Sequence, residues 1–88
     1  YCPADERELQ DMLFFAYRLK RPVMIRYPKG RATALSAETV PFVPGKAVEM
    51  RSGKDVALWC CGRECETGLM VAELLAEKGF YHRCGSFR

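Results

Sequence analysis

The feature that most constrains this chain is a helical pattern that runs directly into a short, wholly apolar segment. Apolar side chains in residues 6–20 recur at the i, i+3, i+4, i+7 spacing of one helix face. They are Leu9, Met12, Leu13 and Ala16, with Phe15 and Leu19 beside them. Pro22 stops the pattern, and the apolar residues 23–25 predict a strand that is buried on both faces. A helix followed at once by a buried strand is half of a β-α-β unit, which indicates an α/β fold.

The start of this helix is marked by Asp5 and Glu8, which stand three residues apart. In this arrangement the Asp5 side chain accepts a hydrogen bond from the free backbone amide of Glu8. Both carboxylates also favour the positive end of the helix dipole. The sequence therefore predicts that the helix begins near residue 6.

Residues 31–44 have neither a helical nor a strand period, and Pro41 and Pro44 interrupt their apolar cluster. This composition is typical of an extended linker between domains. We expect it to be partly docked through Val40, Phe42 and Val43. A domain boundary near residue 40 follows.

The second half of the chain is predicted to form two strands, a helix and a third strand, in that order. Residues 45–51 and 55–61 are joined by a short loop containing Gly53, which predicts a β-hairpin, and the apolar residues 56–61 predict a central strand. Residues 64–78 follow a helical period, and Gly79 stands where a helix C-terminus favours glycine. Residues 80–84 are then the next predicted strand.

Composition limits the classes of partner. Hydrophobic residues make up 49% and charged residues 28%, which is typical of a folded globular chain. The net charge is +3, and the cations are scattered among eleven carboxylates, which argues against nucleic acid as a partner. No apolar stretch approaches the length of a membrane span or follows a basic N-terminus as in a signal peptide. We therefore expect no membrane partner and a cytoplasmic location.

Five cysteines raise the questions of disulfides, metal and catalysis. They are Cys2, Cys60, Cys61, Cys65 and Cys84. An odd count within strand and helix patterns favours reduced, buried thiols over a disulfide framework. Zinc is disfavoured because Cys60 and Cys61 are adjacent in a strand, where they point to opposite faces, and no C-x-x-C pair is present. Nucleophilic catalysis would need a thiol beside His82, but the sequence singles out no cysteine for it.

A resemblance to a known family rests on several short stretches in order. Residues 26–30 read Arg-Tyr-Pro-Lys-Gly, and residues 45–48 and 53–58 read Gly-Lys-Ala-Val and Gly-Lys-Asp-Val-Ala-Leu. Together with the acidic helix start after Pro3, they resemble the 1-deoxy-D-xylulose-5-phosphate synthase family. The resemblance covers residues 3 to about 79.

The resemblance implies an α/β fold, the three-layer α/β/α architecture of transketolase-like enzymes, present only as parts of two domains. Residues 1–30 would be the end of the pyrimidine-binding domain and residues 31–44 the interdomain linker. Residues 45–88 would be the start of the C-terminal domain. The rest of the same polypeptide and a second copy, giving a homodimer, are the implied macromolecular partners.

The activity that the resemblance implies is a condensation of pyruvate with glyceraldehyde 3-phosphate, with loss of CO2, to 1-deoxy-D-xylulose 5-phosphate. This product serves isoprenoid, thiamine and pyridoxal synthesis. The implied cofactors, thiamine diphosphate and Mg2+, would be bound outside this segment, since the Gly-Asp-Gly motif and the glutamate that activates thiamine are not among the 88 residues. We expect the segment alone to be inactive.

Lys29 is the residue to which the resemblance assigns substrate contact. In that family, the second cation of an Arg-Tyr-Pro-Arg-Gly loop contacts the phosphate of glyceraldehyde 3-phosphate. Lys29 occupies this position. Lysine keeps the charge but lacks the planar fork of arginine. Arg26 is a second-tier candidate, because an arginine at a strand end more often forms a structural ion pair. The competing interpretation of Lys29 is a solvated loop lysine.

Two other functions remain open at this point. The chain could be part of another thiamine-diphosphate enzyme, either a transketolase or the E1 β-chain of a 2-oxo-acid dehydrogenase. It could also be a non-enzymatic α/β interaction module. The loop at residues 26–30 favours the synthase, and sequence upstream of Tyr1 would decide among the three.

Overall fold

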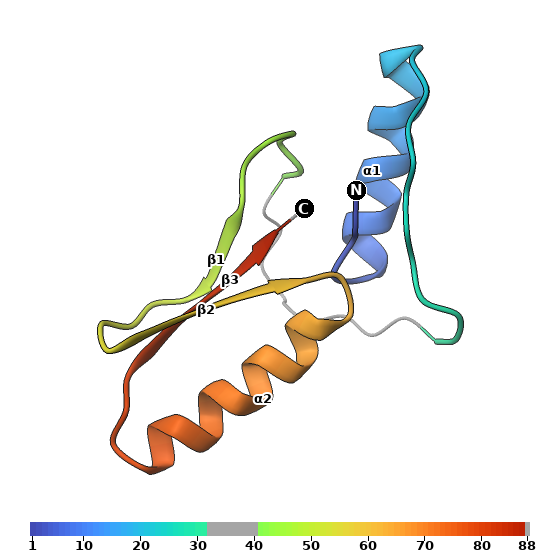
Figure 1. Cartoon of the computed structure of the whole chain (residues 1–88). Coiled ribbons are helices and arrows are strands. Elements are labelled where there is room, and N and C mark those ends of the chain that lie inside the picture. Colours follow the sequence, from blue (N-terminus) through green and yellow to red (C-terminus); the bar gives the residue numbers. More distant parts are fainter. Residues whose placement is uncertain (32–40, 88) are drawn as a thin grey trace.

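The computed structural model describes residues 1–31 and 41–87. Its elements, in chain order, are α1 (Glu6–Leu19), β1 (Val48–Arg51), β2 (Val56–Cys61), α2 (Glu64–Glu77) and β3 (His82–Phe87) (Figure 1). Both predicted helices are confirmed with ends within one residue of those expected. In these described parts of the chain, neither helix is long and apolar enough to cross a membrane.

Helix α1 begins as its sequence predicts. The Asp5 side chain accepts a hydrogen bond of 2.9 Å from the backbone amide of Glu8, and the Glu8 carboxylate accepts one of 2.7 Å from the amide of Ala4. These reciprocal bonds satisfy amide groups that have no partner inside the helix. Met12, on the predicted apolar face, is fully buried. The helix ends at Lys20, which adopts a left-handed conformation with φ 51°.

The sheet has the order β1-β3-β2, with β3 in the middle. The predicted hairpin of the first two strands is therefore wrong, although both strands exist. Helix α2 carries the chain across so that β3 pairs in parallel with all of β2, from Val56 opposite His82 to Cys61 opposite Phe87. The other edge of β3 takes β1 in antiparallel pairing. Strands β1 and β2, which follow each other in sequence, are thus not neighbours in the sheet.

Strand β2 lies at an edge of this sheet rather than at its centre, so the prediction of a central strand is wrong for the described chain. Its burial alternates instead of being continuous, and Trp59 is 54% exposed. The start of the pair is fixed by two hydrogen bonds across it. The amide of Tyr81 donates to the Asp55 carboxylate at 2.8 Å, and the Asp55 amide donates to the Tyr81 carbonyl at 2.7 Å.

Residues 23–25 run extended but form no strand, which corrects another expectation. They pair with a single residue, Tyr1. Its amino group donates to the Met24 carbonyl at 2.7 Å, and its carbonyl accepts from the Arg26 amide at 2.9 Å. A ladder needs a neighbouring strand of several residues, and the described chain places none beside this segment. Met24 is accordingly 83% exposed.

Helix α2 packs on β2 and β3 through small side chains and covers one face of the sheet (Figure 1). Cys65, Gly68 and Ala72 are its buried residues, and their size lets the helix axis approach the strands closely. The predicted helix end at Gly79 is confirmed. Gly79 has φ 84°, and the Phe80 amide donates to the Leu75 carbonyl at 2.9 Å, which closes the last turn.

Three aromatic rings join the N-terminus, α1 and the segment before β1. Tyr1, Phe15 and Phe42 meet pairwise edge to face, with centroid separations of 5.3 to 5.8 Å. Such contacts add about 0.5–1.5 kcal/mol each beyond the burial of area. The predicted docking of the linker through Phe42 is confirmed, whereas Val43 is exposed. Val40, the third predicted contact, lies outside the described residues.

The isolated 88-residue chain is expected to self-associate. Large apolar side chains are exposed on both helices and on β2, and within residues 1–31 and 41–87 no strand pairs with the outer edge of β2. Sedimentation velocity across a concentration series measures this. The double variant Phe14→Gln, Tyr17→Gln on the exposed side of α1 should shift the distribution toward monomer. A monodisperse monomer that unfolds cooperatively in calorimetry would contradict the prediction that other polypeptide covers residues 23–25 and 56–61.

Candidate functional site

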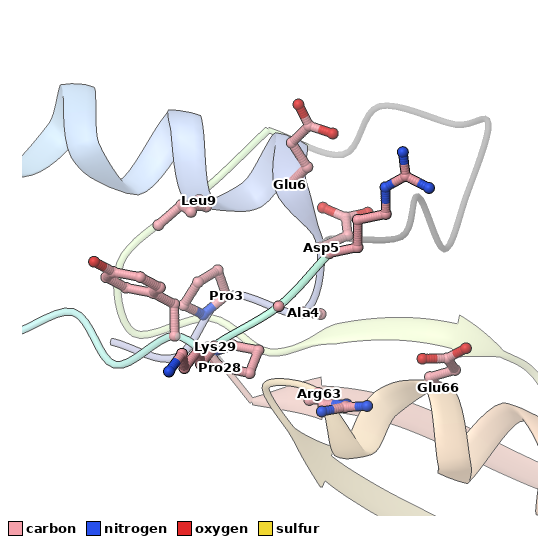
Figure 2. A pocket seen from close by; sticks show the side chains of 12 residues that line it. Pro3, Ala4, Asp5, Glu6, Leu9, Pro28, Lys29, Arg63 and Glu66 are labelled. Atoms are coloured by element: carbon pink, nitrogen blue, oxygen red, sulfur yellow. The ribbon is translucent and has the colours of Figure 1, made fainter.

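A cleft of about 580 Å³ opens where three parts of the chain meet. One wall is residues 3–6 at the start of α1, the second is the loop of residues 27–31, and the third is the first turn of α2 (Figure 2). The first turn of α2 follows β2, and the carboxyl ends of parallel strands are where open α/β sheets place their ligand sites. The position of the cleft is therefore typical of a substrate site.

Charged side chains from all three walls line the cleft. The cations are Lys29 and Arg31 of the loop and Arg63 at the start of α2. The carboxylates are those of Asp5, Glu6 and Glu66. The Asp5 carboxylate already accepts the hydrogen bond that caps α1, so part of its charge is compensated. This mixture suits a small anionic ligand held toward the cations.

Lys29 lies in this cleft, on a loop with a defined shape (Figure 2). Pro28 precedes it, and Gly30 follows with φ 126°, a conformation that residues with a side chain rarely adopt. The backbone on both sides of Lys29 is thereby restricted. Lys29 is exposed to solvent, so its side chain is free to reach a ligand in the cleft.

Arg26, the second predicted site residue, is not among the residues that line the cleft. Its backbone amide donates a hydrogen bond to the Tyr1 carbonyl. Of the two predicted site residues, Lys29 lines the cleft and Arg26 does not.

Arg63 is a site residue that the sequence analysis missed. It follows Gly62, whose φ of 59° makes the turn from β2 into α2, and it lines the cleft from the side opposite the loop of Lys29. A signal was present in the sequence, because a cation directly after a parallel strand stands at the edge where ligands bind. The predicted hairpin concealed that this strand would be one of a parallel pair.

The cysteines occupy different environments. Cys65, in the first turn of α2, is fully buried, as expected for a structural thiol. Cys61 is exposed, which corrects the expectation of a buried thiol at that position. Cys61 is exposed because it ends an edge strand. Among the described residues, no group of three or more His, Cys, Asp or Glu side chains is placed to hold a metal ion.

Cys2 and Cys61 are in contact. Partial burial raises the pKa of the Cys61 thiol above its ordinary value, and so do its hydrogen bond to Cys2 and the charge of Cys2. The positive charge of Arg26 lowers it, but by less. Gly62 lies next to this pair, since a Cβ added there would be in ordinary contact with the Cys2 Cβ at 3.6 Å and the Pro3 carbonyl oxygen at 3.7 Å.

Comparison with solved structures identifies the class of fold. The chain superimposes on a split-gene transketolase, described as an inactive β4 tetramer, with a TM-score of 0.90. The match covers 98% of this chain and 29% of that one, at 24% sequence identity. The predicted fold class is confirmed: the chain has the α/β fold of transketolase-like proteins.

Sequence comparison narrows the class to a family, although no family model matches. The chain is 39% identical over 80 residues to a 1-deoxy-D-xylulose-5-phosphate synthase of Desulforudis audaxviator and 40% identical to that of Methylacidiphilum infernorum. It is 41% identical over 75 residues to that of Cellvibrio japonicus. The resemblance noted in the sequence is confirmed, and the chain is similar to a segment of these synthases. The match to the first two relatives covers 89% of this chain, but this chain spans only 13% of their length.

Alkylation of Cys61 should be slow near neutral pH and should accelerate as the pH rises. A raised pKa means that the reactive thiolate forms only at higher pH than in a free cysteine. Cys2→Ser removes the thiol that raises this pKa, so the alkylation profile of Cys61 should move to lower pH. Iodoacetamide labelling of the 88-residue chain, followed by peptide mass spectrometry, measures both profiles. An unchanged profile in Cys2→Ser would contradict the thiol contact.

Proposed function

We propose that this chain is a segment of a 1-deoxy-D-xylulose-5-phosphate synthase and forms the part of the site that binds the phosphate of the acceptor substrate. The whole enzyme would condense pyruvate with glyceraldehyde 3-phosphate, releasing CO2 and forming 1-deoxy-D-xylulose 5-phosphate. The observation that carries the proposal is that Lys29 and Arg63, from two different parts of the chain, line one cleft. The matches to synthases across 89% of the chain support it.

Lys29 and Arg63 would act on the phosphate in different ways. The ammonium group of Lys29 provides a compact charge, whereas the guanidinium of Arg63 can hold two phosphate oxygens at once. Glu6 and Glu66 oppose an anion near them, so the phosphate is expected to lie toward the two cations. Fixing this end of the substrate would orient its aldehyde toward the remainder of the enzyme.

Thiamine diphosphate and Mg2+ do not fit the residues of this segment. The described part of the chain has no group of three or more acidic, histidine or cysteine ligands, and the sequence has no Gly-Asp-Gly motif. We propose that both are bound by residues elsewhere in the whole enzyme. The segment would then need the rest of its polypeptide for activity, and we expect it to be inactive alone.

The proposed domain arrangement follows the sequence prediction. Residues 1–30 would be the end of the pyrimidine-binding domain, and residues 45–88 would be the start of the C-terminal domain. Residues 31–44 would be the linker between these two domains. The cleft lies between the first and third of these parts, which supports a site shared by two domains. The whole enzyme would be a cytoplasmic homodimer that provides a precursor of isoprenoids, thiamine and pyridoxal.

A transketolase is the second candidate, because the structural match is to a split-gene transketolase. At 24% identity that match supports the fold alone. The relatives at 39–41% identity are all named as the synthase, which favours the synthase. Upstream sequence with a Gly-Asp-Gly motif and an activating glutamate would support any thiamine-diphosphate enzyme and exclude a non-enzymatic interaction module.

Removing the Lys29 charge should selectively weaken use of the phosphorylated acceptor. In the full-length enzyme, Lys29→Ala removes a charge-assisted contact of about 1.5–3 kcal/mol, or about 10- to 150-fold in kcat/KM for glyceraldehyde 3-phosphate. Pyruvate has no phosphate, so its KM should change far less. Lys29→Arg should retain or improve acceptor binding through the bidentate fork. Steady-state kinetics with each substrate varied separately measures these effects.

Lys46→Ala is a matched control, since Lys46 is an exposed loop lysine that does not line the cleft. It should leave both substrates unaffected. Equal losses for pyruvate and glyceraldehyde 3-phosphate in Lys29→Ala would indicate a structural lysine. No loss at all would mean that Lys29 is a solvated loop residue and would contradict the proposal.

A further inference from the structure

We propose that Cys2 and Cys61 form a reversible disulfide that fastens together two walls of the cleft. The bond would join the segment that leads into α1 to the end of β2. It would make this part of the chain sensitive to the thiol–disulfide balance of its surroundings. The disulfide itself is independent of the proposed function, whereas its effect on substrate binding depends on it.

The geometry that carries the proposal is the contact of the two side chains. The Cys61 thiol is hydrogen-bonded to Cys2. The backbone holds the pair in place, since the Cys2 Cβ lies 3.6 Å from the position that a Cβ on Gly62 would take. Tyr1 donates a hydrogen bond to the Met24 carbonyl and accepts one from the Arg26 amide, which fixes the backbone on the other side of Cys2. The two thiols are therefore held beside each other, and formation of the bond requires the sulfurs to close to about 2 Å.

The other described cysteines are less suited to this reaction. Cys65 is fully buried on the inner face of α2, where no oxidant can reach it. Cys60 precedes Cys61 in β2, and successive side chains of a strand point to opposite faces. Cys61 is exposed and Cys2 half-buried, so the pair is open to a small molecule.

A low-molecular-weight disulfide such as glutathione disulfide would be the oxidant. One cysteine thiolate attacks a sulfur of the small disulfide, forms a mixed disulfide and releases one glutathione thiolate. The second cysteine passes its proton to that thiolate, attacks the protein sulfur of the mixed disulfide and expels the second glutathione. The two cysteines are thereby oxidised, and one glutathione disulfide is reduced to two thiols. A reducing thiol reverses both steps.

The position of the bond determines its effect. Cys2 directly precedes Pro3 and the cleft wall at the start of α1, and Cys61 stands two residues before Arg63 on the opposite wall. The loop with Lys29 is tied to the same place, because Arg26 is hydrogen-bonded to Tyr1. A disulfide here fixes the distance between the walls. Oxidation should therefore change the KM for the phosphorylated acceptor more than the KM for pyruvate.

Peptide mapping of the full-length protein tests the bond without any assay of activity. The protein is equilibrated with glutathione and glutathione disulfide at several ratios, blocked with an alkylating agent, and digested with trypsin without reduction. We expect the peptide that ends at Arg7 to be linked to residues 55–63, and the link to disappear with dithiothreitol. Cys2→Ser and Cys61→Ser should each abolish it. Cys60→Ser, the matched control in the same peptide, should retain it.

Absence of the linked peptide from the oxidised wild-type protein, or its persistence in Cys61→Ser, would overturn the proposed disulfide. Kinetics of the oxidised and reduced forms test the effect on the cleft. The acceptor KM should change on oxidation of the wild type and not of Cys2→Ser. A linked protein with an unchanged acceptor KM would refute the fastening of the cleft, while the Lys29 variants would still report separately on phosphate binding.

Discussion

Docking of the first five residues against the end of β2 is the contact on which the cleft depends. Cys2 and Pro3 lie against Gly62, at the end of β2. Tyr1 meanwhile bonds to the backbone of Met24 and Arg26 and packs against two aromatic rings. These contacts place the start of α1, the loop of Lys29 and the start of α2 around one space. A residue with a side chain at Gly62 would strain the turn at φ 59°, and with it the start of α2.

Electrostatics then determine what this space can hold. Capping of α1 engages the Asp5 carboxylate, while the loop and the start of α2 supply cations to the same cleft. The interaction of charges grows as water is displaced, so the cations act most strongly on a ligand that fills the cleft. A phosphorylated sugar of three carbons is small enough for a volume of about 580 Å³. The cleft is therefore large enough for the substrate that we propose.

The sequence predicted the local features well and the non-local ones poorly. Capping by Asp5 and Glu8 and the helix end at Gly79 depend on residues a few positions apart, and the structure has both. The pairing of β3 between β1 and β2 depends on the crossover through α2, which no local pattern reveals. The same limit explains why Lys29 was predicted from a contiguous loop but Arg63 was missed. It also explains why, in the part of the chain that the structure describes, no strand lies beside residues 23–25 as their apolar character predicted.

Lys29 and Arg63 are proposed to bind the same phosphate in the cleft, and a double-mutant cycle tests this most directly. Lys29→Ala, Arg63→Ala and the double variant are compared in the full-length enzyme by kcat/KM for glyceraldehyde 3-phosphate. Two groups on one phosphate should be coupled by about 0.5–3 kcal/mol, so the double variant should depart from additivity. Losses that add to within about 0.5 kcal/mol would mean that the two residues act independently and would contradict the claim.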